Sequence, residues 1–467
     1  MLNYFPKYFT NKAIVLYLAT ITVVSFVFFR QIMYWYWFIF GIVEVVLFFY
    51  YTNFLTKKWS HLSQKMFIRK IFTVSIVIRI IWVLVSYFFY TAMTGIPFEF
   101  SVGDALAYNV QANEIATKGY GALGEIFKGI ELGDTGYSTY LGSLYMIFGL
   151  DSIIIVRLIK AALGAWTAVL LYKLAVRNFG ESTARITAII FMLMPNFVYY
   201  TGLHLKEVEM VFLTVVYLER TDNLIRSKKF NFINFILPFL TASALFTFRT
   251  PLGITALFAL LTALLFSTEK IFGLGQRFII TLWILVAVAF FIGSKVTTEV
   301  EQLWKERQTN QQGSMQWRSI REGGNKFAEK ASTAVFAPAI FIIPVPTMVN
   351  VEIQQNQQLL HGGNFDKEIL AFFVFIALVW IIKNKKWRDF TLLGAFTIGY
   401  LAVIAMSAFA QSERFHQPAL PFIVMFAAFG VTKVTNSAKK YYVAYLVVLF
   451  FIIVGWSWFK LAGRGLA

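Results

Sequence analysis

Long apolar runs recur along the whole chain and constrain its fold more than any other feature. A helix needs about 20 apolar residues to cross the hydrocarbon core of a bilayer, and runs such as "AIVLYLATITVVSFVFF" return throughout the 467 residues. The residues are 58% hydrophobic and only 14% charged, whereas soluble domains carry about 25% charged residues. The pattern predicts an all-α polytopic membrane protein.

We expect about thirteen transmembrane helices by this length criterion. They are placed at 13–29, 32–52, 71–92, 152–173, 183–201, 207–219, 231–248, 251–268, 277–294, 367–382, 390–409, 418–432 and 441–459. The first is interpreted as a retained span, because no small-x-small cleavage site follows its apolar run.

The basic residues are unevenly divided between the two sides that these spans define. The net charge is +18, from 42 Lys and Arg against 24 Asp and Glu. Alternate segments, beginning with residues 1–12, hold 22 Lys and Arg, and the short loops and chain end on the other side hold eight. Since cytoplasmic loops carry the excess of positive charge, the N-terminus is expected inside and the C-terminus outside. The charge then reflects topology and anionic lipid, not nucleic acid.

The stretch "SVGDALAYNVQANEIATKGYG" (101–121) is a polar interruption that this topology places on the outer face. Asp104 is predicted to cap a helix of about four turns that ends at Gly119, with Tyr108 on the same face as Asp104. Asp104 is either a cap, the reactive carboxylate of a site at the membrane surface, or both. A carboxylate at a helix start is held ionised by the helix dipole.

Several motifs follow this stretch in a characteristic order. They are Asp-x-x-x-Tyr after a span, "DTGYSTYLGSLYMIFG", an Arg in the next helix, "VRNFGESTARITAIIFMLMP", an acidic residue opening the following span, and "SERFHQPALP" later in the chain. The ordered set resembles the GT-C superfamily of glycosyltransferases, in particular the family 39 group, which includes protein O-mannosyltransferases and lipid A aminoarabinose transferases.

The resemblance implies a polyprenyl-phosphate-linked sugar donor and a catalytic carboxylate in the first outer loop, which corresponds to Asp104. The acceptor would be a lipid, a glycan or a protein reached from the outer face. In a bacterium the protein would lie in the cytoplasmic membrane with its site facing the periplasm.

Such a reaction needs a base for the acceptor and cations for the departing phosphate. Asp104 is the expected base, with Glu207 as its acidic partner. The candidate cations stand at separate outer turns or near a helix end, and snorkelling at the interface is the alternative reading for each: Arg249, Arg414, Lys206 and Arg157. Candidate substrate-binding residues are Tyr108, Tyr137, His204, His416, Arg318 and Arg321. A divalent metal is left open, because His204 and Glu207 at i and i+3 could share one.

These expectations divide the chain into four parts. Residues 1–70 are two N-terminal spans and a cytoplasmic linker, 71–294 the GT-C-like core with outer loop 93–151, 295–366 a long outer loop, and 367–467 the C-terminal spans. An envelope-polysaccharide polymerase or O-antigen-type ligase is the second reading, and a lipid-linked sugar flippase or transporter is the third. The chain has no cysteine, which excludes disulfides and thiol chemistry.

Overall fold

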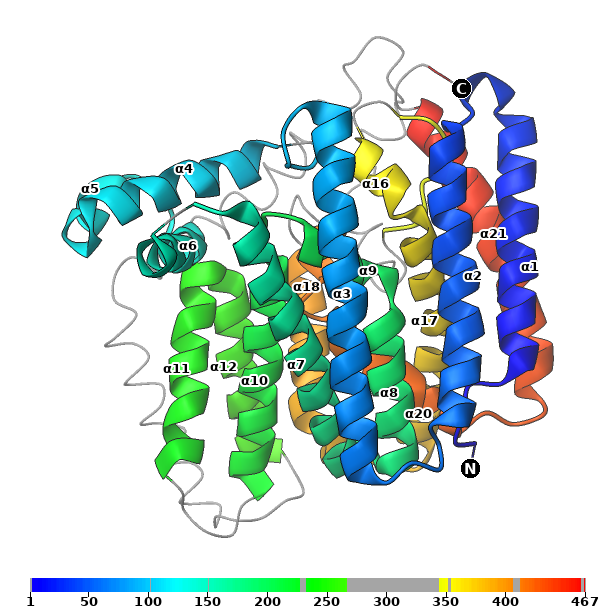
Figure 1. Cartoon of the computed structure of the whole chain (residues 1–467). Coiled ribbons are helices and arrows are strands. Elements are labelled where there is room, and N and C mark those ends of the chain that lie inside the picture. Colours follow the sequence, from blue (N-terminus) through cyan, green and yellow to red (C-terminus); the bar gives the residue numbers. More distant parts are fainter. Residues whose placement is uncertain are drawn as a thin grey trace.

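The computed structural model describes residues 2–100, 102–149, 151–226, 232–266, 344–351, 354–405, 412–462 and 466. Within these ranges the chain forms helices and no strands (Figure 1). The expected span at 277–294 and most of the long outer loop, including Arg318 and Arg321, lie outside the described residues.

The longer helices run roughly side by side (Figure 1). In chain order the α-helices are α1 (Lys7–Val27), α2 (Trp35–Lys58), α3 (Gln64–Thr94), α4 (Gly103–Lys118), α5 (Leu123–Ile126), α6 (Thr135–Phe148), α7 (Ile153–Phe179), α8 (Glu181–Leu193), α9 (Pro195–Tyr199), α10 (Glu207–Arg226), α11 (Phe232–Phe248), α12 (Thr250–Phe266), α16 (Gln355–Leu359), α17 (His361–Lys383), α18 (Thr391–Ala405), α19 (Glu413–His416), α20 (Leu420–Thr432) and α21 (Ala438–Ala462). Short 3-10 turns join some of them, including η3 (Leu132–Asp134), η4 (Tyr200–Gly202) and η6 (Trp387–Phe390).

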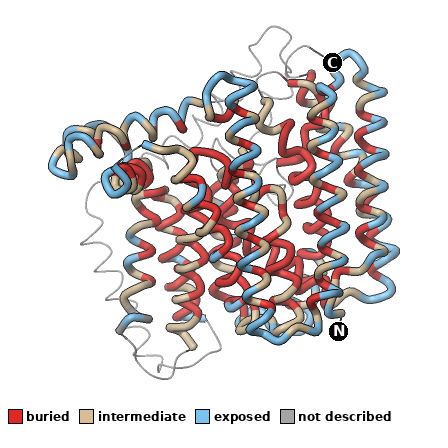
Figure 2. The backbone as a smooth tube through the Cα atoms, in the orientation of Figure 1, coloured by how far each residue is buried: buried red, intermediate tan, exposed pale blue. Residues whose placement is uncertain are grey.

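Six helical segments in the described part are long and apolar enough to cross a membrane: α1, α2, α3, α7, Trp387–Ala405 and α21. Shorter apolar helices lie at Ile236–Phe248, Thr250–Phe266 and Leu420–Thr432. Figure 2 shows exposed residues along α1, α2 and α3 and a buried centre around α8 and α17. Large apolar side chains such as Phe26 and Phe88 are exposed on the outer helices, as expected for surfaces that face lipid.

Most expected spans in the described residues correspond to one helix each, but the span expected at 183–201 is wrong. The chain there forms two helices, because Pro195 has no N–H to continue the hydrogen-bond ladder of α8. The last carbonyls of α8 need donors, which lipid does not supply. Arg79 of α3 donates to the carbonyls of Phe191 and Met192, each at 3.5 Å, and to Ser75 Oγ at 2.5 Å.

The backbone N–H groups at the start of α17 also find a hydrogen-bond partner on another helix, α2. The Gly363 N–H donates to Glu44 Oε2 at 3.1 Å, so an acidic side chain of a spanning helix neutralises free donors at a helix N-terminus. The two helices approach closely here, since a Cβ on Gly362 would lie 2.8 Å from the Gly41 carbonyl oxygen. This contact fixes α17 and the chain that follows it against α2.

Helices α4 and α5 project from one end of the bundle, here called the α4 end (Figure 1). Helix α4 buries Ala105, Tyr108, Ala112 and Ile115, a spacing that forms one helical face, and it packs against α6. Helix α6 in turn contacts α11. The helix predicted for the polar stretch is therefore confirmed, and it packs against α6.

Candidate functional site

Arg414 joins two carboxylates at the α4 end. Its Nη1 atom donates to Asp104 Oδ2 at 2.5 Å and its Nε atom donates to Glu207 Oε1 at 2.7 Å. The two carboxylates differ in environment, since the side chain of Glu207 is 1% exposed and that of Asp104 is 58% exposed. Three segments far apart in the sequence thus meet at one guanidinium.

Lys206, next to Glu207, makes a second ion pair. Its ammonium group donates to the Gly133 carbonyl at 2.9 Å and to Asp134 Oδ1. The Tyr108 hydroxyl also donates to Asp134 Oδ1, at 3.3 Å. Asp134 is therefore a third carboxylate of this group, and its contacts tie η3 to α4 and to the turn before α10.

Arg249 completes the group from the turn between α11 and α12. Its guanidinium carbon lies 4.0 Å from the centre of the Phe415 ring, and it is within electrostatic range of Glu207 and Asp134. A Cβ on Gly133 would lie 3.0 Å from the Thr250 backbone nitrogen, so η3 packs directly on the start of α12. We name Asp104, Asp134, Lys206, Glu207, Arg249 and Arg414 the charged cluster.

The charges of the cluster stabilise one another. Burial alone would raise the pKa of Asp134, but Lys206 and Arg249 lower it below its usual value. Burial opposes the charge of Arg414, yet Glu207 and Asp104 raise its pKa overall. Burial is the largest influence on Lys206 and lowers its pKa, with Asp134 opposing it. The arrangement holds the Asp134 carboxylate and the Arg414 guanidinium in their ionised forms.

The predicted capping role of Asp104 is wrong. Helix α4 begins at Gly103 with Val102 at the N-cap position, and no side chain caps it. Asp104 lies in the first turn, where the helix dipole still favours a negative charge, but its carboxylate contacts Arg414 instead of backbone N–H groups. The predicted end of the helix is confirmed, since Gly119 follows Lys118 with a φ of 77°.

A second group of predicted residues lies next to the cluster. Tyr137 is fully buried, with its ring centre 5.0 Å from that of Tyr108 and 6.3 Å from that of His204. Arg157 is also fully buried and donates to the Pro97 carbonyl. It was expected to act with Arg249, Arg414 and Lys206, but it lies within electrostatic range of Glu99 instead. Because Arg157 is not exposed, its side chain does not snorkel to the interface.

Two carboxylates of this region, Glu99 and Asp134, were not among the predicted site residues. Both belong to the acidic first outer loop, but only the fold shows which of its acidic residues turn inward. Lys206 pairs with Asp134, and Lys160 pairs with Glu209 at 3.4 Å.

The remaining predicted residues fall at the edge of the site or outside the described structure. His416 is buried in α19, two residues from Arg414. Arg318 and Arg321 lie outside the described residues.

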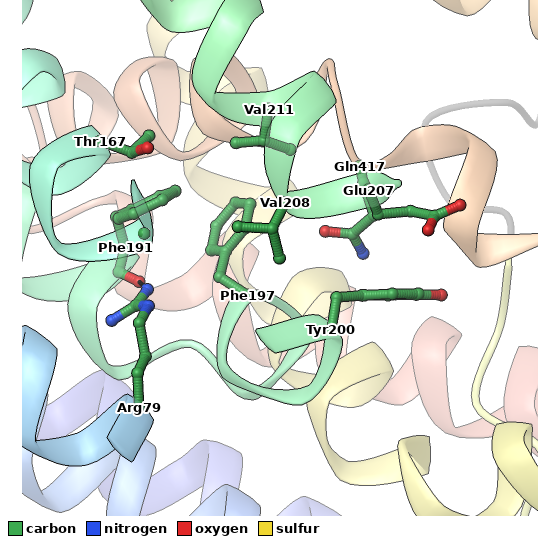
Figure 3. Close-up of a pocket in the computed structure, with 10 residues that line it drawn as sticks. Arg79, Thr167, Phe191, Phe197, Tyr200, Glu207, Val208, Val211 and Gln417 are labelled. Carbon is green, nitrogen blue, oxygen red and sulfur yellow. Dashed lines mark hydrogen bonds between the residues drawn. The ribbon is translucent and has the colours of Figure 1, made fainter. Parts of the chain in front are cut away.

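A small pocket runs beneath Glu207 towards the interior of the bundle (Figure 3). It is lined by apolar side chains such as Phe197, Val208 and Val211, and by polar groups at its ends, with Glu207 and Gln417 on one side and Arg79 on the other. The pocket places Glu207 between the charged cluster and an apolar interior.

The possibility of a metal ion rested on His204 and Glu207. Among the described residues no group of three or more His, Asp or Glu has the geometry to hold a metal ion. His204 and Glu207, the pair considered for this role, have other surroundings: the His204 Nε2 atom lies 3.4 Å from the Tyr145 hydroxyl, and Glu207 accepts from Arg414.

Comparisons with known proteins give a structural similarity but no sequence match. No protein-family model matches the chain, and no curated protein matches its sequence. Its structure is similar to that of the archaeal oligosaccharyltransferase AglB from Archaeoglobus fulgidus, solved with an inhibitory peptide and a dolichol-phosphate, with a TM-score of 0.46 and 12% identity. The match covers 86% of this chain and 56% of that one, so this chain spans just over half the length of the oligosaccharyltransferase. A similarity of this size carries no argument about activity.

Proposed function

We propose that this chain is a GT-C-type membrane glycosyltransferase that moves a sugar from a polyprenyl-phosphate-linked donor to an acceptor at the α4 end of the bundle. The observation that carries the proposal is the convergence of Arg414, Lys206 and Arg249 around Glu207. Arg414 also holds Asp104, the more exposed of its two carboxylate partners. Cations held in place before the reaction stabilise charge that develops on a leaving group.

The charged cluster is electrically balanced without a ligand. It holds three carboxylates (Asp104, Asp134 and Glu207) and three cations (Lys206, Arg249 and Arg414). A donor phosphate therefore has to replace a carboxylate as the partner of a cation. Asp104 is the one to exchange, because its side chain is 58% exposed while Glu207 is 1% exposed. Exchange places the phosphate on Arg414 and frees Asp104.

The freed carboxylate then serves as the general base. As the acceptor oxygen or nitrogen forms its bond to the anomeric carbon, the bond from that carbon to the phosphate oxygen breaks. The acceptor proton passes to Asp104, and the electron pair of the broken bond stays on the polyprenyl phosphate. Arg414, Arg249 and Lys206 hold that phosphate as its negative charge grows.

Glu207 has a different role in this proposal from the one the sequence suggested. It is buried and already accepts a hydrogen bond from Arg414 Nε, so it is not available to an acceptor. We assign it to positioning: it holds the guanidinium of Arg414 with Nη1 directed to the open side, where Asp104 or a phosphate can bind.

Three cationic side chains supply the charge that this step needs, and the proposal therefore includes no metal ion. The orientation indicated by the Lys and Arg distribution places the site on the outer side of the membrane, where the acceptor would be a lipid, a glycan or a protein. A polymerase or ligase of envelope polysaccharide would use the same anion-binding cations. The size of the sugar group that is transferred distinguishes such an enzyme from the glycosyltransferase proposed here.

A binding and transfer assay with the purified protein tests the proposal. We expect the wild type to bind a C55 polyprenyl phosphate and Arg249→Ala to bind it about tenfold or more weakly, the equivalent of losing one charge-assisted contact. Asp104→Asn should bind the donor and lose transfer. The matched control is Glu114→Gln, which removes a carboxylate of the same helix that is 38% exposed and pairs with Lys118 at 2.6 Å. Full transfer by Asp104→Asn would show that another group is the base.

A further inference from the structure

A second set of buried polar side chains lies beside the charged cluster and takes no part in the step above. It consists of Glu99 before α4, Tyr137 of α6, Arg157 of α7 and His204 before α10. Each is at most 3% exposed. We name these four residues the polar pocket group.

The members of this group have polar atoms without partners. The hydroxyl of Tyr137, Nε and Nη1 of Arg157 and Nδ1 of His204 make no hydrogen bond to any part of the chain that the structure describes. The carboxylate of Glu99 has no partner there beyond its own backbone N–H. Native proteins pair nearly all such buried groups, because each unpaired one costs about 1–3 kcal/mol. So many in one place indicate a polar occupant, either bound water or a ligand that displaces it.

Electrostatic interactions and ring contacts connect the four side chains. Arg157 is within electrostatic range of Glu99, Tyr137 and His204. The ring of His204 lies 6.3 Å from that of Tyr137 and 5.7 Å from that of Phe98, centre to centre. Tyr137 packs edge-on against Tyr108 of α4, at 5.0 Å, and Glu99 is also within range of Arg414. The group therefore adjoins the cations proposed to hold the donor phosphate.

The hydrogen-bonding character of the group is mixed. The Tyr145 hydroxyl donates to Asn109 Oδ1 at 2.7 Å, so the contact between Tyr145 and His204 Nε2 at 3.4 Å requires the nitrogen to donate. That tautomer leaves His204 Nδ1 as an acceptor. Burial, reinforced by Lys160 and Arg157, lowers the pKa of His204 well below its usual value, which keeps the ring neutral. Free donors on Arg157 and Tyr137 thus stand beside free acceptors on Glu99 and His204.

Few ligands match this combination. A phosphate accepts hydrogen bonds but offers Glu99 and His204 no donor, and an isoprenoid chain satisfies none of the free atoms. A sugar ring carries hydroxyl groups that both donate and accept, and its C–H faces pack against aromatic rings such as those of Phe98 and Tyr137.

We infer that the polar pocket group is a subsite for a sugar ring, in which Glu99, Tyr137, Arg157 and His204 pair with its hydroxyl groups. The inference rests on the proposed function, since it places the ring next to the phosphate-binding cations. The ring belongs either to the donor or to a glycan acceptor, and the two share this chemistry.

Donor binding with and without the sugar tests the inference. The probes are a C55 polyprenyl phosphate and the same lipid phosphate carrying mannose or glucose, bound to the purified full-length protein in detergent. We expect a sugar-bearing lipid to bind the wild type more tightly than the free lipid phosphate. Tyr137→Phe should reduce that preference about fivefold or more, the effect of leaving one sugar hydroxyl unpaired, without changing the affinity for the free lipid phosphate.

Tyr137→Phe removes a single oxygen and keeps the ring contacts, so it is the variant least prone to misfold. Glu99→Gln is the second variant, because an amide keeps the size of the side chain and loses one acceptor. The control is Tyr120→Phe, whose hydroxyl bonds Ser143 at 2.9 Å on the exposed side of the same loop region. The control should keep the preference for the sugar-bearing lipid.

The outcomes separate the inference from the proposed function. Failure of the wild type to bind any polyprenyl phosphate contradicts the proposed function. Binding of the free lipid phosphate, with no added affinity from a sugar and no competition by methyl mannoside or methyl glucoside, overturns the subsite and leaves the proposed function standing. Competition by a methyl glycoside that Tyr137→Phe weakens supports the subsite and assigns it to the acceptor.

Discussion

The two ion pairs of Arg414 should differ sharply in strength, and this difference can be measured. Arg414 is 21% exposed and contacts Glu207, which is 1% exposed, and Asp104, which is 58% exposed. Breaking a buried pair by removing one partner costs about 3–5 kcal/mol, because a charge is left without compensation. An exposed pair contributes about 0.2–1 kcal/mol.

These values give an expected double-mutant cycle. Arg414→Gln should destabilise the protein by roughly 3 kcal/mol, at the lower end of the buried range, because Lys206 and Arg249 still face Glu207. In the Glu207→Gln background the same change should cost much less, since no buried charge is left unpaired. The coupling energy should be about 2–3 kcal/mol with Glu207 and below about 1 kcal/mol with Asp104.

The assay is equilibrium unfolding in mixed micelles by added SDS, with the fraction unfolded followed by tryptophan fluorescence. All single and double variants are measured at one ionic strength, because exposed pairs weaken with salt. Equal coupling energies for the two pairs, or strict additivity of Arg414→Gln and Glu207→Gln, would refute the assignment of Glu207 as the buried partner that positions Arg414.

Three further predictions concern charge and pH. Burial raises the pKa of Glu413 to about 7 from an ordinary 4.5, although a hydrogen bond from Asn196 opposes this; stability should therefore fall as pH rises from about 4.5 to 7 and then level off. With Glu413→Gln, the melting temperature measured over this pH range should fall less. An unchanged dependence of the melting temperature on pH would exclude Glu413 as the cause of the fall. Lipid-phosphate binding should survive EDTA, because side-chain cations supply the charge; a complete loss that Mg²⁺ or Mn²⁺ restores would place a metal ion in the site. Asp134→Asn removes the carboxylate that pairs with Lys206, so Lys206 should be acetylated faster, as followed by mass spectrometry. An unchanged acetylation rate would show that Asp134 does not restrain Lys206.

The sequence carries enough information for the class of fold and for part of the site. Apolar runs mark spanning helices because lipid requires every backbone group to be satisfied within the helix. Arg249, Arg414 and Lys206 could be selected since each is a lone cation at a turn between apolar segments, and the structure brings these turns together. Their convergence could not be read from spacing, because Asp104 and Arg414 are 310 residues apart.

Other features depend on tertiary contacts that leave no local signal. The carboxylate of Asp104 satisfies the usual pattern for a helix cap, yet Arg414 is a stronger partner than the backbone N–H groups. The break of the span expected at 183–201 was marked by Pro195, but the donor that makes the break tolerable is Arg79 from another helix. Glu99 looked like any acidic residue of an outer loop until its burial against Arg157 was visible.

We propose that Asp104, together with Arg414 and the neighbouring cations, transfers a sugar from a lipid phosphate to an acceptor at the cell envelope. The most direct measurement is mass spectrometry of envelope glycans, glycolipids and glycoproteins from cells that lack the gene and are complemented with the wild type, Asp104→Asn or Glu114→Gln. The account predicts a sugar modification that is restored by the wild type and by Glu114→Gln and is absent with Asp104→Asn at equal protein level. Full restoration by Asp104→Asn, or identical glycans with and without the gene, would contradict it.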